Sequence, residues 1–181
     1  MLLRPPPPYY LRPMCLDDLP AVTAIDAASF PTAWPVSGYR HELAKNERAT
    51  YYVLVHRPAG QLARIIGYTG YWLMGDELHL STIAVAPRWR GRGLGELLLL
   101  QVLFDALSNR ATMVTLEVRR GNEIAQSLYR KYEFAVVGER RGYYRDTGED
   151  ALLMTLELAE APIRQQLEEH RDELWQRMGE V

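Results

Sequence analysis

The stretch Ile83–Glu96 reads IAVAPRWRGRGLGE and joins an apolar strand end to a leucine-rich helix that begins near Leu94. Its turn carries three arginines and three glycines: Arg88, Arg90, Arg92, Gly91, Gly93 and Gly95. The glycines let the backbone adopt positive φ and approach a ligand, so that successive N–H groups converge on an anion at the positive end of the helix. The turn is a candidate phosphate site; the alternative is a solvated turn that caps a core helix.

Two better-known glycine loops do not fit this turn. A Walker A loop ends in Gly-Lys-Ser/Thr, but Gly95 is followed by Glu96 and Leu97, so the phosphate-binding lysine and the magnesium-binding hydroxyl are missing. A dinucleotide-binding loop needs its third glycine at the position of Glu96. The sequence therefore gives no support for nucleotide hydrolysis or dinucleotide binding.

Length, composition and charge limit the kinds of protein that this chain can be. With 181 residues, of which 48% are apolar and 24% charged, the chain suits one α/β domain. Its net charge of −2 gives no overall basic field, so we expect no nucleic-acid partner. The single Cys15 cannot form an internal disulfide, and no Cys/His grouping has metal-ligand spacing. We therefore expect a protein of the reducing cytoplasm without a metal site.

No segment predicts a membrane span or a secretion signal. The apolar run 97–104 is interrupted by Gln101 and is too short to cross a bilayer, so we expect no membrane association. Residues 1–8 contain four consecutive prolines where a signal peptide has its apolar block. We interpret them as an extended proline-rich tail.

Apolar periodicity predicts strands and helices on both sides of the turn. Before it we expect strands at 9–14, 50–55, 63–73 and 77–85 and helices at 19–28 and 37–45. After it we expect a helix at 94–107, a strand at 112–118, a helix capped by Asn122, and strands at 134–138 and 151–158 around a polar, tyrosine-rich connection. Two prolines make 29–36 a loop, in which Phe30 and Trp34 either plug the core or wall a substrate groove.

The C-terminal segment predicts a separate amphipathic helix at 160–178. Pro162 lies in its first turn, and its apolar residues form one stripe: Ile163, Leu167, Leu174 and Met178. Because an apolar stripe is most often core, we favour a helix folded back on its own domain over a helix that binds a partner or a second copy.

Motifs beyond the turn resemble one enzyme family. The strand after the turn ends in Leu116-Glu117-Val118-Arg119, and Asn122, Leu128-Tyr129 and Phe134 follow. With these motifs, residues 9–158 resemble the GNAT family of N-acetyltransferases, and Arg90–Gly95 is similar to its Arg/Gln-x-x-Gly-x-Gly/Ala acetyl-CoA motif. Within the family, residues 116–119, 141–144 and 149–151 are similar to the RimI-type enzymes that acetylate the N-terminal alanine of a ribosomal protein.

This resemblance implies an architecture and an activity. It implies a GNAT domain at 9–158, to which the residue patterns add a proline-rich tail at 1–8 and a C-terminal helix at 159–181. The GNAT fold has a mixed, mostly antiparallel sheet of about seven strands flanked by helices. The implied enzyme is a cytoplasmic, acetyl-CoA-dependent N-acetyltransferase that transfers directly, in a ternary complex, to the N-terminus of a peptide or ribosomal protein. Its oligomeric state, monomer or homodimer, stays open.

The resemblance also implies roles for individual residues. The backbone of Ile83, Ala84 and Val85 would contact the pantetheine arm and the acetyl group. The diphosphate would lie on Arg90, Gly91, Arg92, Gly93, Leu94 and Gly95, with Asn122 as a further coenzyme contact. Glu117 would be the general base, and Tyr129 would protonate the departing thiolate. Phe30, Pro31, Tyr143 and Tyr144, beside Trp34, would hold the acceptor peptide. One departure from the family lies before Phe134, where Glu133 replaces the usual glycine.

The chemistry of amine acetylation agrees with these roles but leaves alternatives. An α-amino group of pKa about 8 is roughly one-tenth neutral at pH 7, and a lysine far less. Glu117 could instead form an ion pair with Arg119 or Arg120, and Tyr129 could be a core residue. His79 is interpreted as a strand residue with a satisfied ring, and no nucleophile pairing predicts a covalent acyl-enzyme. A GNAT enzyme for small amines or lysine, and a non-catalytic CoA-binding scaffold, remain as other functions.

Overall fold

A mixed seven-stranded sheet is the centre of the part of the chain that the computed structural model describes, residues 2–158 and 162–179. Its strand order is β1-β2-β3-β4-β5-β7-β6, in which β4 and β5 are parallel and all other neighbours antiparallel. The strands are β1 (Tyr9–Pro13), β2 (Ala49–His56), β3 (Arg64–Met74), β4 (Glu77–Val85), β5 (Met113–Arg119), β6 (Ala135–Tyr144) and β7 (Glu149–Glu157). The predicted mixed, mostly antiparallel sheet is confirmed.

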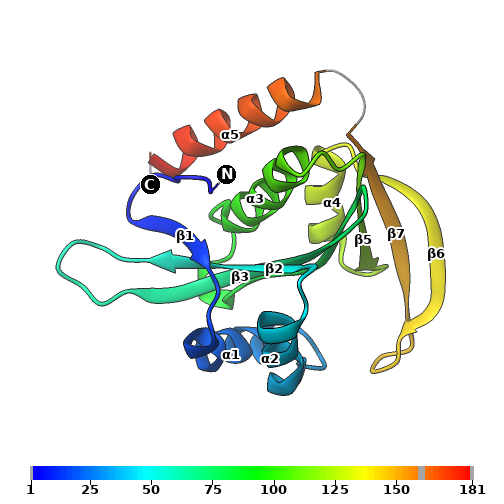
Figure 1. Cartoon of the computed structure of the whole chain (residues 1–181), viewed down its shortest axis with the longest axis horizontal. Coiled ribbons are helices and arrows are strands. Elements are labelled where there is room, and N and C mark those ends of the chain that lie inside the picture. The colour runs from blue at the N-terminus through cyan, green and yellow to red at the C-terminus, as the bar shows by residue number, and fades with distance from the viewer. Residues whose placement is uncertain (1, 159–161, 180–181) are drawn as a thin grey trace.

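Helices cover both faces of this sheet (Figure 1). They are α1 (Leu19–Ser29), α2 (Val36–Lys45), α3 (Leu94–Ser108), α4 (Glu123–Lys131) and α5 (Ile163–Gly179). The pair α1 and α2 lies on one side, and α3, α4 and α5 lie on the other. Each face therefore has its own hydrophobic core, and the sheet separates the two cores.

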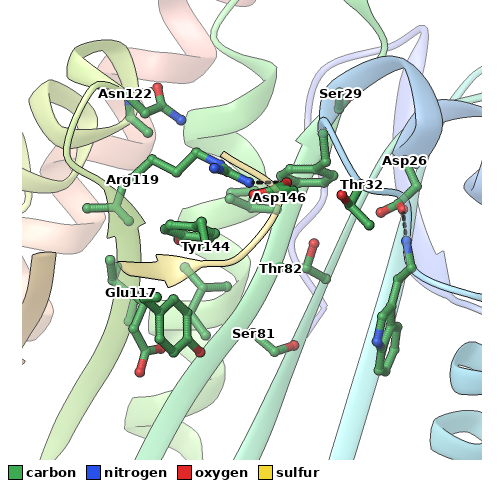
Figure 2. A pocket seen from close by; sticks show the side chains of 18 of the residues that line it. Asp26, Ser29, Thr32, Ser81, Thr82, Glu117, Arg119, Asn122, Tyr144 and Asp146 are labelled. Carbon is green, nitrogen blue, oxygen red and sulfur yellow. Dashed lines mark hydrogen bonds and ion pairs between the residues drawn. The ribbon is translucent and has the colours of Figure 1, made fainter. Parts of the chain in front are cut away.

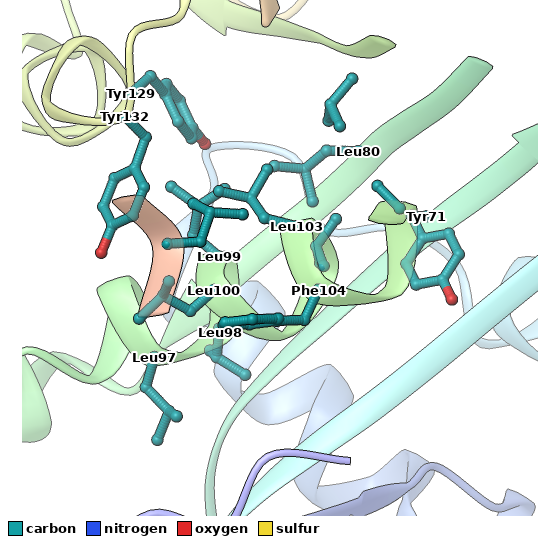
Figure 3. Packing of buried hydrophobic residues seen from close by; sticks show 14 of the residues in the cluster. Tyr71, Leu80, Leu97, Leu98, Leu99, Leu100, Leu103, Phe104, Tyr129 and Tyr132 are labelled. Atoms are coloured by element: carbon teal, nitrogen blue, oxygen red, sulfur yellow. The ribbon is translucent and has the colours of Figure 1, made fainter. Parts of the chain in front are cut away.

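Helix α3 is buried on nearly all sides because it lies between the sheet and α5. Its run Leu97–Leu100 is fully buried, as Figure 3 shows for the leucines against Phe104 and Tyr132. This position explains why apolar residues cover more than one face of α3 in the sequence. On α5, the predicted stripe packs into the same cluster through Leu167, Leu174 and Met178. The predicted helix start at Glu160 lies outside the described residues.

The parallel strands β4 and β5 separate part-way along their length. They pair only from Glu77 opposite Met113 to Leu80 opposite Leu116. Beyond that point β4 continues to Val85, still paired with β3 on its other side, while β5 continues beside β7. The second half of β4 therefore has no strand partner on the side that faces β5, and a gap opens in the sheet.

One sequence-based boundary was wrong. Strand β6 runs to Tyr144 rather than Gly138, so most of the predicted tyrosine-rich connection is strand and only 145–148 form the turn. The cause is exposure: β6 is an edge strand with largely exposed side chains, so it lacks the alternating pattern that reveals a half-buried strand. At the other end of the chain, within the predicted proline-rich tail, Leu3 is buried and its N–H donates to Gln101 Oε1 at 2.8 Å, so this residue packs against the domain.

Glu133 occupies a backbone conformation that suits glycine, with φ of 63°. A left-handed conformation costs a non-glycine residue about 1–2 kcal/mol, more than the conformational entropy that glycine loses on folding. We expect Glu133→Gly to raise the free energy of unfolding by about 1 kcal/mol, measured in urea. Glu173→Gly, in the interior of α5, is the control and should lower it by a similar amount. A destabilised Glu133→Gly would contradict this assignment of strain.

Candidate active site

A cavity of about 850 Å³ lies where β4 and β5 separate. Figure 2 shows its walls: the end of α1 with the following loop, strands β4 and β5, the start of α4, and the β6–β7 hairpin. Eight of the residues singled out in the sequence line it: Phe30, Trp34, Ile83, Glu117, Asn122, Tyr129, Tyr143 and Tyr144. They come from five parts of the chain, which the fold brings to one place.

The glycine turn borders this cavity and does not line it, and the same holds for Pro31, Ala84 and Val85. Gly91 and Gly93 have φ of 76° and 74°, as predicted for a turn that aims N–H groups at a ligand. The Arg90 side chain has another role: its Nε donates to the Val85 carbonyl and its Nη2 to Ser29 Oγ, both at 3.0 Å.

Two other residues of the predicted anion site, Arg92 and Leu94, differ in the exposure of their side chains. Arg92 is exposed and lies over the Trp89 ring, 4.9 Å from its centroid. Leu94 is 1% exposed and its side chain packs in the core. Because this side chain is buried, only the backbone N–H of Leu94 could contact a ligand.

Glu117 and Tyr129 reach the cavity from opposite faces of the sheet. Leu116 and Val118 pack in the core beside α3 and α4, so the alternation of a strand puts Glu117 on the other face. Tyr129 comes from α4, on the α3 side (Figure 1). The gap between β4 and β5 lets both side chains line one cavity.

Two side chains, His79 and Arg140, hold the Glu117 carboxylate. His79 Nε2 lies 3.1 Å from Oε2, and Arg140 Nη1 lies 2.9 Å from Oε1. The hydrogen bond with His79 and the positive charge of Arg140 hold the pKa of Glu117 below its usual value, although burial opposes them. The alternative that Glu117 pairs with Arg119 or Arg120 was wrong, because these guanidinium groups pair with Asp146 and Glu139, respectively.

Both ring nitrogens of His79 have hydrogen-bond partners, in agreement with the sequence-based interpretation of a strand residue with a satisfied ring. Its Nδ1 lies 2.9 Å from the Thr115 hydroxyl, which itself donates to Glu77. Its ring stacks on Trp72 at 5.7 Å between centroids. The imidazole therefore presents Nε2 to Glu117 in one orientation.

Tyr129 and Asn122 belong to one helix and line the cavity together. Tyr129 is buried, which raises the pKa of its phenol, and its hydroxyl makes no hydrogen bond within residues 2–158 and 162–179. Asn122 Oδ1 accepts from the Ala125 N–H at 3.2 Å, so this residue also caps α4, as predicted. The Asn122 amide group faces the cavity in Figure 2.

Sequence reasoning missed the residues that hold the walls of the cavity. Asp26, 2% exposed, accepts hydrogen bonds from the hydroxyls of Tyr39 and Tyr68 and, at 2.6 Å, from the Trp34 backbone N–H. Asp26 thereby fixes the loop that carries Phe30 and Trp34. The signal in the sequence is one carboxylate beside the apolar positions of an amphipathic helix.

Arg119 fixes the β6–β7 hairpin in a similar way. Its Nη2 lies 2.8 Å from Asp146 Oδ2, and its Nη1 donates to Thr147 Oγ1 at 2.8 Å. Its guanidinium lies 3.9 Å from the centroid of the Tyr144 ring, and burial raises the pKa of Tyr144 to about 12. The hairpin wall of the cavity is therefore tied to the end of β5.

Comparison with known proteins identifies the family of this chain. The model of the acetyltransferase (GNAT) family matches residues 19–134. A Bacillus subtilis protein, provisionally named a ribosomal protein bS18-alanine N-acetyltransferase, is 39% identical over 150 residues, which are 83% of this chain and 96% of its own. The chain belongs to the GNAT acetyltransferase family. It is therefore an N-acetyltransferase, and it resembles the RimI-type enzymes.

Two further N-acetyltransferases, one compared by sequence and one by structure, are also similar to this chain. The N-alpha-acetyltransferase RimI of Mycobacterium tuberculosis is 40% identical over 125 residues, covering 67% of this chain and 73% of that protein. The crystal structure of the ribosomal-protein-S18-alanine N-acetyltransferase from Escherichia coli superposes with a TM-score of 0.73 at 27% identity, over 84% of this chain and 96% of that one. The GNAT fold expected from the sequence is confirmed.

None of the described helices of this GNAT chain is both long and apolar enough to cross a membrane. No group of three or more His, Cys, Asp or Glu side chains within residues 2–158 and 162–179 is placed to hold a metal ion.

The pKa of Glu117 offers a direct test of the site's electrostatics. His79→Ala removes the hydrogen bond that lowers this pKa most, so we expect the pKa to rise towards the ordinary value of about 4.3. The measurement is a carbon-13 NMR titration of the Glu117 carboxyl, assigned with Glu117→Gln. His56→Ala serves as the control, because that ring packs between Tyr9 and Trp89. An unchanged pKa of Glu117 in His79→Ala would show that His79 does not stabilise its charge.

Proposed function

We propose that this GNAT enzyme transfers the acetyl group of acetyl-CoA to the N-terminal α-amino group of a protein, with a ribosomal protein as acceptor and the cytoplasm as its place of action. The observation that carries the proposal is the meeting of Glu117 and Tyr129, from opposite faces of the sheet, in one cavity. The names of the relatives in Bacillus subtilis and Escherichia coli, which specify bS18-alanine, support the choice of acceptor.

The residues present fit acetyl-CoA. The second half of β4 leaves backbone groups without a strand partner on the β5 side, where an amide-bearing pantetheine arm could pair with them. The positive-φ glycines at the start of α3 fit a diphosphate. In our assignment Ile83–Val85 hold the arm, Arg90–Gly95 hold the diphosphate, and Asn122 adds a polar contact. Acetyl-CoA supplies an acetyl group already activated as a thioester.

Glu117 is assigned as the proton acceptor. With its pKa held below the usual value, the carboxyl group is ionised at neutral pH and has an oxygen that can accept a proton. It takes a proton from the acceptor amine at a carboxylate oxygen, directly or through a water molecule, as the nitrogen attacks. An N-terminal amine suits this arrangement better than lysine, because a larger share of it is neutral at pH 7.

Tyr129 is assigned as the proton donor to the departing thiolate. The raised pKa of its phenol keeps the proton on the hydroxyl at neutral pH. Burial disfavours a phenolate, but it disfavours a thiolate in the same cavity as well, so proton transfer from oxygen to sulfur stays feasible. No hydrogen bond to another described residue contributes to this pKa, so none competes for the proton.

The acceptor peptide is assigned to the groove between two aromatic walls. One wall is the loop with Phe30, Pro31 and Trp34, which Asp26 fixes. The other is the β6–β7 hairpin with Tyr143 and Tyr144. Both walls are tied to the domain by hydrogen bonds, a partly buried one at Trp34 and an exposed one at Thr147, which favours one orientation of an extended chain.

Two substitutions test the proton transfers. Glu117→Gln and Tyr129→Phe keep the shapes of the side chains and remove the acceptor and the donor, so we expect kcat to fall by about 10²–10⁴ for each. The dissociation constant of acetyl-CoA, measured by calorimetry, should change little. Glu123→Gln, on the exposed first turn of α4, is the control and should retain full kcat. Unchanged kcat in both site variants would remove the assigned roles.

An acceptor panel tests the substrate class. The panel contains a peptide that begins with alanine, the same peptide with a blocked N-terminus and one lysine, and a set of polyamines. We expect acetylation of the free N-terminus in the first peptide, read by mass spectrometry. Activity confined to the blocked peptide or the polyamines would favour a lysine or small-amine enzyme, and no activity with any of them would favour a CoA-binding scaffold.

A further inference from the structure

A buried carboxylate lies directly behind the glycine turn. Glu96 follows Gly95 in the first turn of α3 and is 7% exposed. It does not line the large cavity, and none of the roles assigned above uses it. A buried charge is retained only where partners compensate the loss of water, so its partners identify what it connects.

The partners of Glu96 come from two other helices. At the end of α4, the Lys131 ammonium and the Tyr132 hydroxyl, at 2.9 Å, both bind Oε1. On α5, Arg177 Nη2 lies 2.9 Å from Oε2. Although burial opposes ionisation, these bonds hold the pKa of Glu96 below its usual value. One carboxylate thus joins α3, α4 and α5.

Helix α5 also contacts the turn itself. At Gly93, a Cβ atom would lie 2.6 Å from Leu174 Cδ1, so α5 packs directly against this backbone. Leu174 is fully buried there. The turn and the first residues of α3 therefore rest on α5, on the side away from the β5 strand and its Glu117.

Helix α4 connects the Glu96 carboxylate with the cavity. Asn122 and Tyr129 line the cavity from α4, and Lys131 and Tyr132 follow at its end. The bonds of Glu96 thus fix the glycine turn relative to the helix that carries the assigned proton donor.

We propose that Glu96 is a positioning residue for coenzyme binding, and that α5, through Arg177 and Leu174, stabilises the diphosphate-binding form of the turn without entering the cavity. This inference rests on the proposed acetyl-CoA function. Charge supports it as well as packing: Glu96 places a negative charge beside the assigned diphosphate site, and Lys131 and Arg177 outweigh it. Loss of Arg177 would remove one of these two cations and the ion pair that ties α5 to the first turn of α3.

Linkage makes the effect reciprocal. If docking of α5 strengthens coenzyme binding, the coenzyme must strengthen the docking of α5 by the same factor. The two predictions can be measured separately, one on a variant and one on the unaltered chain.

Arg177→Ala is the first test, because this side chain is half-exposed and its loss leaves the core intact. We expect the dissociation constant of CoA, measured by calorimetry, to rise about fivefold or more, the lower range of coupling between sites. The kcat at saturating acetyl-CoA should change less than the KM for acetyl-CoA, and Arg177→Lys should recover part of the affinity. Arg164→Ala, which removes the same charge from an exposed position on α5, is the control and should bind as the unaltered chain does.

The second test is hydrogen exchange on the full chain. Saturation with CoA should slow deuterium uptake in 163–179 as well as in the glycine turn. Equal CoA affinity of Arg177→Ala and Arg164→Ala, or unchanged uptake in α5 while the turn is protected, would overturn this inference and leave the proposed function standing. Failure of the unaltered chain to bind CoA would overturn both.

Discussion

The separation of β4 from β5 is the constraint on which the rest of the site depends. Two parallel strands that paired along their whole length would satisfy their backbone groups and close the sheet. Here pairing ends at Leu80 and Leu116, and the remaining backbone of β4 faces a cavity. The same gap lets a carboxylate from one face and a phenol from the other reach a common space, which a continuous sheet would forbid.

Ion pairs and hydrogen bonds hold the walls of this gap in place. Glu117 is held between His79 and Arg140, Asp26 fixes the loop after α1, and Arg119 fixes the β6–β7 hairpin. Each of these groups would be costly to bury alone, and each is paired across elements that are distant in the sequence. The cavity is therefore shaped before any substrate binds, as catalysis by positioned proton donors and acceptors requires.

Behind the site, a second set of paired charges supports the glycine turn. Helix α3 brings the turn to the edge of the cavity, and Glu96 joins that helix to α4 and α5. The C-terminal helix thus continues the hydrophobic core and also contacts the backbone of Gly93. In this view α5 is part of the support of the coenzyme site as well as a cover for α3.

Features that depend on local backbone geometry and periodicity can be derived from the order of the residues alone. Positive φ at Gly91 and Gly93, the cap at Asn122 and most strands and helices follow from short-range sterics and apolar spacing, so they could be predicted. Only the tertiary structure decided the partners of Glu117, the full length of β6 and the contacts of Glu96. His79 meets Glu117 because β4 lies beside β5, and Arg140 arrives from β6 across β7. Such pairs join residues tens of positions apart, and no local pattern encodes which strands become neighbours.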